Sequence, residues 1–214
     1  LVRYDGMDHV SFEHMTFTRT GIGVYKRLVE FPSLTGEASL HPRFRHMRFL
    51  GNSGHSTSQI MIGDNAQDEE RVEIEHCRFE NGRSDLVWNA NGTNERLFIR
   101  NSVFLGGLNT VVQLTGLRDS LVISDNEISG ANPVLLELDD CDTDFLIVYN
   151  RLRASVNGTC LTLSNSAAPS GSAGKVLNNE LISINGTGLF IAGTTDRAHI
   201  QHNSISSGGT FAIY

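Results

Sequence analysis

The chain has 214 residues, of which 39% are hydrophobic and 19% are charged, a balance typical of a globular protein. Its net charge of -7 argues against nucleic acid as a partner, because binding to phosphates requires a basic surface. No apolar run is long enough to span a membrane, and the abundance of Gly and Asn favours short strands and turns over long helices.

Eight copies of one short pattern follow one another along the chain. Each copy is a run of alternating apolar residues, then a polar corner, then one or two further strand residues. The copies begin at Val10, Pro42, Val72, Leu97, Leu121, Phe145, Gly174 and Ala198. Successive copies start 24 to 32 residues apart, and a period of this length is typical of a solenoid.

A second strand-like run, such as VVQL or VLLEL, lies between most copies and follows a glycine-rich turn. The pattern therefore gives three short strands and three turns for each coil. We predict an all-β fold, a single-domain right-handed parallel β-helix of about eight coils that covers residues 1–214. Because both ends of the sequence cut through a repeat, we expect the domain to be part of a longer chain.

One polar position recurs inside the corner of the later copies. It is occupied by Asn126, Asn150, Asn179 and Asn203. Equivalent residues of stacked coils lie about 4.8 Å apart, so these amides can hydrogen-bond to one another and to the corner backbone. Asn also tolerates the left-handed conformation that a tight corner needs. We predict a structural Asn ladder at this corner.

Outward positions of the strand before this corner form rows across the coils. One row alternates in charge through Glu13, Arg45, Glu75 and Arg100, which favours stacking in register. Further along, the same face becomes apolar. The outward residues there are Phe98, Val122, Leu146, Val148 and Leu177. An apolar outward patch predicts a cover, so we expect a neighbouring domain or subunit to pack against it.

The densest acidic segment is ELDDCDTD, from Glu137 to Asp144. Glu137, Asp139 and Asp140 are the candidate catalytic residues, since two carboxylates can act as acid and base on a sugar, and Arg118 is a candidate partner. Carboxylate oxygens also suit Ca²⁺, which is therefore a candidate cofactor, although no metal-ligand set is defined by spacing. A solvated acidic turn is the alternative interpretation.

The eight copies, from Val10 to Ile205, resemble the right-handed β-helices of the pectin-lyase-like superfamily. The resemblance covers nearly the whole chain and implies the fold. It also implies that a polysaccharide would bind along the face that contains Glu30, Glu137 and Asp139. The chain lacks the Arg-Ile-Lys motif of polygalacturonase-like members and the Asp-Pro-His-Asp signature of alginate epimerases, so no enzyme family is matched.

Three functions follow as hypotheses. The first is a β-helical module of a secreted or surface protein, bacterial by the resemblance, that binds a glycan or serves as a structural scaffold. The second is a polysaccharide-active enzyme, a lyase or glycoside hydrolase, that uses the acidic groove around Glu137 to Asp140. The third is an assembly element that contacts other chains through the apolar outward patch. The fold also predicts an extracellular or cell-surface location.

Overall fold

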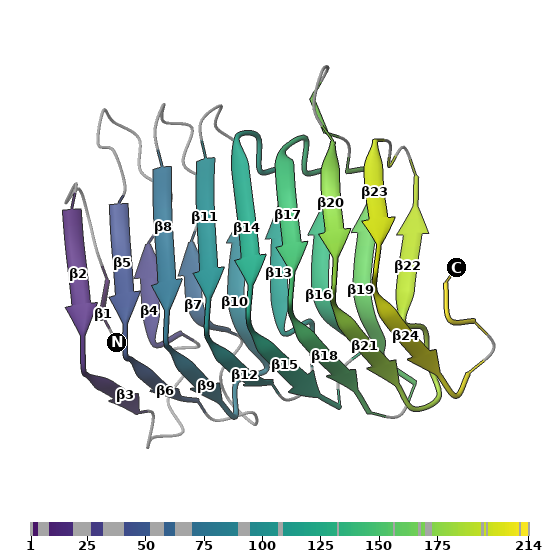
Figure 1. The fold of residues 1–214 in the computed structure, drawn as a ribbon. Coiled ribbons are helices and arrows are strands. Elements are labelled where there is room, and N and C mark those ends of the chain that lie inside the picture. Colours follow the sequence, from purple (N-terminus) through teal and green to yellow (C-terminus); the bar gives the residue numbers. More distant parts are fainter. Residues whose placement is uncertain are drawn as a thin grey trace.

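The computed structural model describes residues 2–3, 9–18, 27–31, 41–51, 58–62, 70–89, 95–106, 109–131, 133–155, 157–166, 168–169, 173–193, 195, 197–209 and 211–213. Every secondary-structure element assigned in these ranges is a β-strand. Within them, no helix has the length and apolar character needed to cross a membrane. The strands form three sheets of eight strands each, and every pairing is parallel (Figure 1).

The chain visits the three sheets in the same order in each coil, so each sheet collects every third strand. Sheet A contains β1 (Val2–Arg3), β4 (Val29–Phe31), β7 (Ser58–Ile62), β10 (Ser84–Asn89), β13 (Val112–Thr115), β16 (Val134–Asp139), β19 (Thr159–Ser164) and β22 (Leu189–Ala192). Sheet B contains β2 (His9–Glu13), β5 (His41–Arg45), β8 (Glu70–Glu75), β11 (Glu95–Arg100), β14 (Ser120–Ser124), β17 (Asp144–Val148), β20 (Gly174–Leu177) and β23 (Ala198–Gln201). Sheet C contains β3 (Thr16–Thr18), β6 (Arg48–Leu50), β9 (Arg78–Glu80), β12 (Val103–Gly106), β15 (Glu127–Gly130), β18 (Arg151–Ala154), β21 (Glu180–Ser183) and β24 (Ser204–Ser207).

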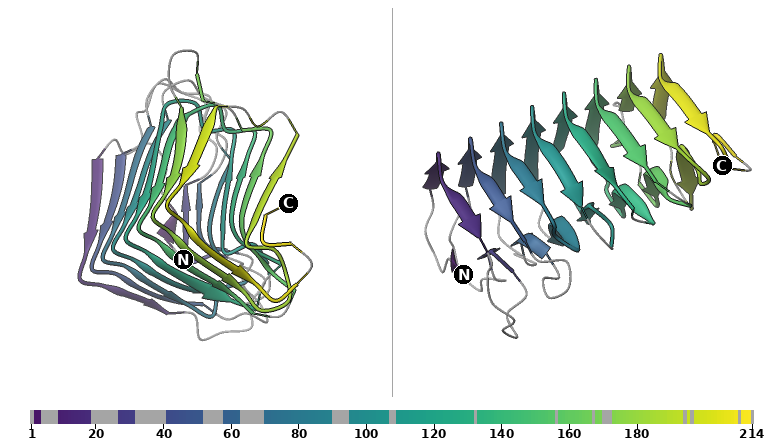
Figure 2. Two further views of the ribbon diagram at one scale, coloured as in Figure 1. Left: turned by 45° about the vertical axis from the view of Figure 1, so that its right-hand side comes forward. Right: turned by 90° about the horizontal axis from the view of Figure 1, so that it is seen from below.

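The architecture confirms the predicted right-handed parallel β-solenoid with three short strands per coil. In the oblique left-hand view of Figure 2, equivalent strands of successive coils lie side by side in each sheet, and the sheets surround one hydrophobic core. Alternate side chains of each strand enter that core, as the period-two pattern predicts. In sheet C the inward row is aromatic at its N-terminal end, where Phe49 stacks on Phe79 at 4.6 Å and Phe79 on Phe104 at 4.5 Å between ring centroids.

The Asn ladder lies at the corner between sheets B and C, as predicted. The side-chain amide of each ladder residue donates to the amide oxygen of the next, at 2.9 to 3.0 Å from Asn126 through to Asn203. Each amide oxygen also accepts from a backbone N–H of the preceding coil, at 2.9 to 3.0 Å. Asn126, Asn150 and Asn179 are each only 2% exposed, so these bonds satisfy groups that cannot reach water.

The left-handed conformation at this corner belongs to the residue before the ladder, which corrects the sequence-based explanation. The φ angles of this row lie between 50° and 57° in His14, His46, His76, Asn101, Asp125, Tyr149, Asn178 and His202. None of the ladder asparagines has a positive φ. The bend turns the following side chain inward, so the ladder position requires an amide for its hydrogen bonds and not for its backbone freedom. The three early histidines of the row stack as parallel rings 4.8 and 5.0 Å apart.

The row of alternating charge is also observed. Arg45 Nε lies 3.1 Å from Glu75 Oε2 on the next strand, and Glu75 Oε1 lies 4.0 Å from Arg100 Nη1. These pairs are partly exposed, so each contributes little stability by itself, but together they oppose a slip in register.

Candidate functional site

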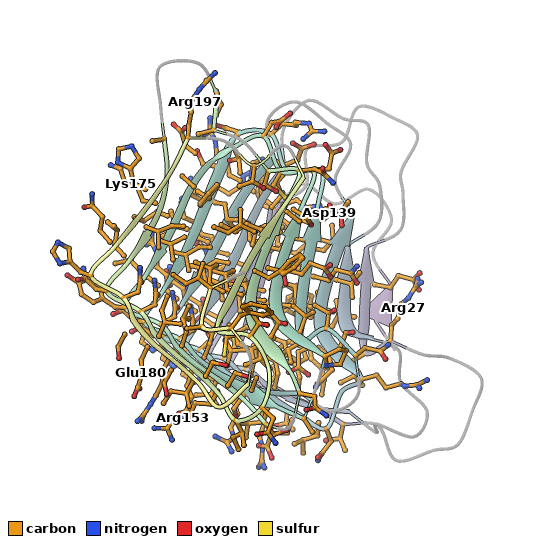
Figure 3. The ribbon with its side chains drawn as sticks, turned by 90° about the vertical axis from the view of Figure 1, so that its right-hand side faces the viewer. Arg27, Asp139, Arg153, Lys175, Glu180 and Arg197 are labelled. Carbon is orange, nitrogen blue, oxygen red and sulfur yellow. The ribbon has the colours of Figure 1, made fainter. Side chains whose placement is uncertain are left out.

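Glu137 and Asp139 lie two residues apart on β16, so both side chains project from the outer face of sheet A. Figure 3 shows Asp139 on the side of the molecule formed by this sheet, whereas Lys175 projects from sheet B. Along an extended strand, alternate residues are separated by about 6.6 Å, which places the two carboxylates within electrostatic reach of each other. The structure therefore brings together two of the three predicted catalytic residues.

Glu137 is partly buried, and its environment favours the protonated form. Burial raises the pKa of its carboxyl group above the ordinary value, and the charge of Asp139 raises it further. The hydroxyl of Thr110 donates to Glu137 Oε2 at 3.3 Å, which acts in the opposite direction but does not reverse the shift.

Asp139 is held by two donors from the next coil. Ser164 Oγ donates to Asp139 Oδ1 at 3.0 Å, and Asn165 Nδ2 lies 3.4 Å from the same oxygen. Because the donors come from the adjacent strand and corner, they fix the orientation of the carboxylate over the sheet. The neighbouring Glu137 instead accepts from Thr110 of the preceding coil, so the two acids are in different environments.

The carboxylate of Asp140 does not lie beside those of Glu137 and Asp139 on the strand. Asp140 lies at the corner after β16 with a φ of 52°, and its carboxylate pairs with Arg118 Nη2 at 2.9 Å. Arg118 also contacts the backbone oxygen of Asp140 and lies 3.5 Å from Asp142 Oδ2. The predicted partner Arg118 thus binds Asp140 at the corner, and a catalytic role for either residue stays a prediction.

Calcium binding by the acidic segment stays a prediction. Across the described part of the chain, no group of three or more His, Cys, Asp or Glu side chains converges in a way that could hold a metal ion. Two of the acids between Glu137 and Asp144 are already paired with Arg118. Glu137 and Asp139 alone supply fewer oxygen ligands than Ca²⁺ takes.

Polar side chains surround the two acids on sheet A in two adjacent rows. The central row passes through Gln113, Glu137 and Thr162, and the next row passes through Thr115, Asp139 and Ser164. Further along the central row in the C-terminal direction lies Phe190. The result is a strip of hydrogen-bonding groups across three stacked strands, β13, β16 and β19.

The predicted interface residues lie together on the outer face of sheet B. Phe98 pairs with Val122, and Val122 with Leu146, in one row, while Val148 pairs with Leu177 in the next. All five are partly buried by their neighbours rather than fully exposed. The patch exists as predicted, and its role as an interface stays a prediction.

Sequence reasoning missed the polar end of this same row. The register that links Phe98 to Val122 also links Phe98 to Glu73, and Glu73 to Arg43. Extending the row two coils toward the N-terminus would have identified a buried carboxylate among arginines. Glu73 is only 6% exposed and is paired with Arg43 and Arg71.

Comparison with known proteins adds no assignment to this geometry. No family model matches the chain, and no curated protein or solved structure matches it either. Function therefore has to be argued from the side chains on the outer faces of the sheets.

Proposed function

We propose that the chain is a β-helical module of a secreted or cell-surface protein and that it binds a neutral glycan along sheet A. The observation that supports this most directly is the polar strip formed by Gln113, Glu137, Thr115, Asp139 and Ser164, which are all partly exposed, whereas Thr162 between them is buried. We also propose that the chain belongs to the pectin-lyase-like superfamily. The resemblance in the stacked coils and the corner Asn supports this membership.

The chemistry of the strip suits sugar hydroxyl groups. Carboxylates accept hydrogen bonds, while hydroxyl and amide side chains both donate and accept them. The strands repeat about every 4.8 Å, so equivalent groups recur along the axis in a rigid array. A rigid array loses little conformational entropy on binding. Because the strip contains two carboxylates and no Lys, Arg or His, an uncharged glycan is favoured over an acidic one.

A glycan array with the intact chain tests the proposal, followed by titration of any glycan that binds. Gln113→Ala and Asp139→Ala should each weaken binding about tenfold, because each removes hydrogen bonds to the ligand. A tenfold change in affinity corresponds to about 1.4 kcal/mol of binding free energy. Glu180→Gln on sheet C is the matched control and should leave binding unchanged. Absence of binding to every glycan, or equal effects of the control and the sheet A variants, would contradict the proposal.

The different environments of Glu137 and Asp139 favour a second candidate, hydrolysis of a glycosidic bond. A carboxyl group with a raised pKa can donate its proton to the leaving oxygen as the C–O bond breaks. Glu137 would be that acid, and Asp139 would be the carboxylate that activates water or attacks the sugar.

Release of new reducing ends from a panel of polysaccharides tests this candidate. Ultraviolet absorbance of unsaturated products from uronate polymers tests the lyase alternative. We expect loss of product in both Glu137→Gln and Asp139→Ala, with Glu180→Gln as the control. If no polysaccharide yields product, the enzyme hypothesis is discarded and the binding proposal is unaffected.

A further inference from the structure

A pocket of about 320 Å³ opens on sheet B toward the N-terminal end of the solenoid. Residues from β2, β5, β8 and β11 line it, among them His9, His41, Arg43, Arg71, Glu73 and Arg96. Its volume is at the small end of the range for ligand pockets. It lies on a different sheet from Glu137 and Asp139, so it requires a separate explanation.

Glu73 holds the arginines of this pocket in place. Its Oε2 lies 2.6 Å from Arg43 Nε, and its Oε1 lies 2.8 Å from Arg71 Nη2. Burial by itself raises the pKa of Glu73, but the hydrogen bond from Arg43 and the charges of Arg43, Arg71 and Arg45 outweigh it and keep this pKa below its ordinary value. The buried carboxylate therefore stays charged and orients two guanidinium groups.

Further contacts hold the arginines on their other sides. Arg71 lies over the ring of Phe98, 5.2 Å from its centroid, and Arg96 Nε lies 2.5 Å from Asp119 Oδ2. The side chains of Arg43, Arg71 and Arg96 nevertheless remain 43, 48 and 43% exposed. Each guanidinium group is thus fixed by a protein partner and still accessible from solvent.

The charges that line the pocket do not balance. Three guanidinium groups and the carboxylate of Glu73 line it, and Asp119 pairs with Arg96 beside it, so an excess of one positive charge remains in a protein whose net charge is -7. The rings of His9 and His41 stack at 4.5 Å between centroids and form a flat wall on the same pocket. Ser11 also lines it, with its hydroxyl hydrogen-bonded to Glu13 Oε1 at 3.1 Å.

We propose that this pocket binds a doubly charged oxyanion, a sulfate or phosphate group. Guanidinium groups present parallel N–H donors that match the oxygens of such a group, and charge-assisted bonds of this kind are about twice as strong as neutral ones. A sulfate or phosphate dianion has enough oxygens to accept hydrogen bonds from all three guanidinium groups. These groups are already fixed by Glu73, Phe98 and Asp119, so they need little reordering on binding. The stacked imidazoles would lie beside whatever bears the anion.

Isothermal titration calorimetry on the intact chain tests the proposal at fixed ionic strength with NaCl as the background salt. The probes are inorganic sulfate, inorganic phosphate, a monosaccharide phosphate ester and glucuronate. Binding of a dianion with an affinity well above that of chloride is expected. If the ester binds at least tenfold more tightly than the free ion, the natural ligand is an anionic group on a larger molecule. If the two affinities are equal, the natural ligand is the free ion.

Arg71→Gln and Arg96→Gln should each reduce the affinity at least tenfold. Arg151→Gln is the matched control, because Arg151 is 48% exposed and pairs with Glu180 on sheet C. Thermal unfolding verifies that each variant is folded, and two separate pocket variants are included in case one is not. The proposal is overturned if sulfate and phosphate bind no better than chloride, if glucuronate binds more tightly than every dianion, or if Arg151→Gln weakens binding as much as the pocket variants. Failure here would leave the glycan proposal for sheet A intact.

Discussion

At the scale of single residues, Asp85 is the least expected feature of the core. Its side chain is 0% exposed, and its Oδ1 accepts a hydrogen bond from Gln59 Nε2 at 2.6 Å. Asp85 Oδ2 and Gln59 Oε1 are both buried without a hydrogen-bond partner. Burial raises the pKa of Asp85 to about 7, and the bond from Gln59 only partly offsets this. A proton on Oδ2 would turn one of these two acceptors into a donor.

This environment predicts that the protein loses stability as the pH rises toward 7 and beyond. The folded-state pKa of Asp85 lies above its ordinary value of 3.8, so between these values the folded chain holds a proton that the unfolded chain has lost. The contribution is fully present below about pH 4 and is lost as the pH passes through about 7, at roughly 1.4 kcal/mol per pKa unit. Asp85→Asn should remove this dependence and raise the free energy of unfolding at pH 8.

Urea unfolding at a series of pH values measures the effect. Asp144→Asn replaces an exposed carboxylate on sheet B and is the control, which should retain the pH dependence of the parent chain. A pH profile for Asp85→Asn that follows the parent chain would show that Asp85 is charged in the folded state.

At the scale of elements, the corners determine the fold as much as the strands do. The corner between sheets A and B contains a second, shorter ladder that the sequence pattern did not reveal. Ser166 Oγ accepts from the backbone N–H of Cys141 at 3.1 Å, and Thr195 Oγ1 accepts from the N–H of Ser166 at 3.3 Å. The residues before Cys141 and Ser166 are Asp140 and Asn165, both with positive φ. The two corners therefore share one design, a left-handed residue followed by an inward polar side chain.

The Asn ladder gives a prediction about this design. Asn150 Oδ1 accepts from Asn126, and Asn150 Nδ2 donates to Ile123 O at 2.7 Å and to Asn179 Oδ1 at 3.0 Å. Asn150→Ala would leave several buried groups unpaired, so we expect it to reduce the free energy of unfolding by roughly 3 kcal/mol or more, which chemical denaturation would measure.

Asn150→Ser is the informative control. Ser102 already occupies this row, where its hydroxyl accepts from Cys77 N at 3.1 Å and donates to Arg100 O at 2.9 Å. Serine should therefore retain part of the network and cost less than alanine. Equal losses for the two variants would show that volume, and not hydrogen bonding, matters at this corner.

At the scale of the whole molecule, each coil is stabilised mainly by the coils on either side of it. Ile147, Val176 and Ile200 occupy one inward row of sheet B. Ile147 is 0% exposed, whereas Ile200 is only partly buried, because it lies nearer the end of the stack. Stability in such an array is approximately a sum over neighbouring repeats.

The same truncation should therefore cost different amounts at two positions in this row. We expect Ile147→Ala to reduce the free energy of unfolding by about 2 to 5 kcal/mol, the range for a fully buried aliphatic residue. Ile200→Ala should cost about half of that or less, since part of its surface already contacts water. Denaturant titration of both variants gives the comparison, and equal losses would argue against a stack with weaker outer coils.

The sequence by itself determined the fold of this protein and the rows of its sheets. A repeated apolar pattern fixes which residues face the core, and a repeat length of one coil fixes which residues lie above one another, so Asn126 to Asn203 and Gln113 to Thr162 could be aligned without coordinates. Only the tertiary structure decided how side chains on these rows pair. It showed that Asp140 turns to Arg118 while Asp139 stays beside Glu137, and that Arg43, Arg71 and Arg96 surround one pocket with Glu73. Such pairings depend on distances between side chains from different strands and corners, which a one-dimensional pattern does not contain.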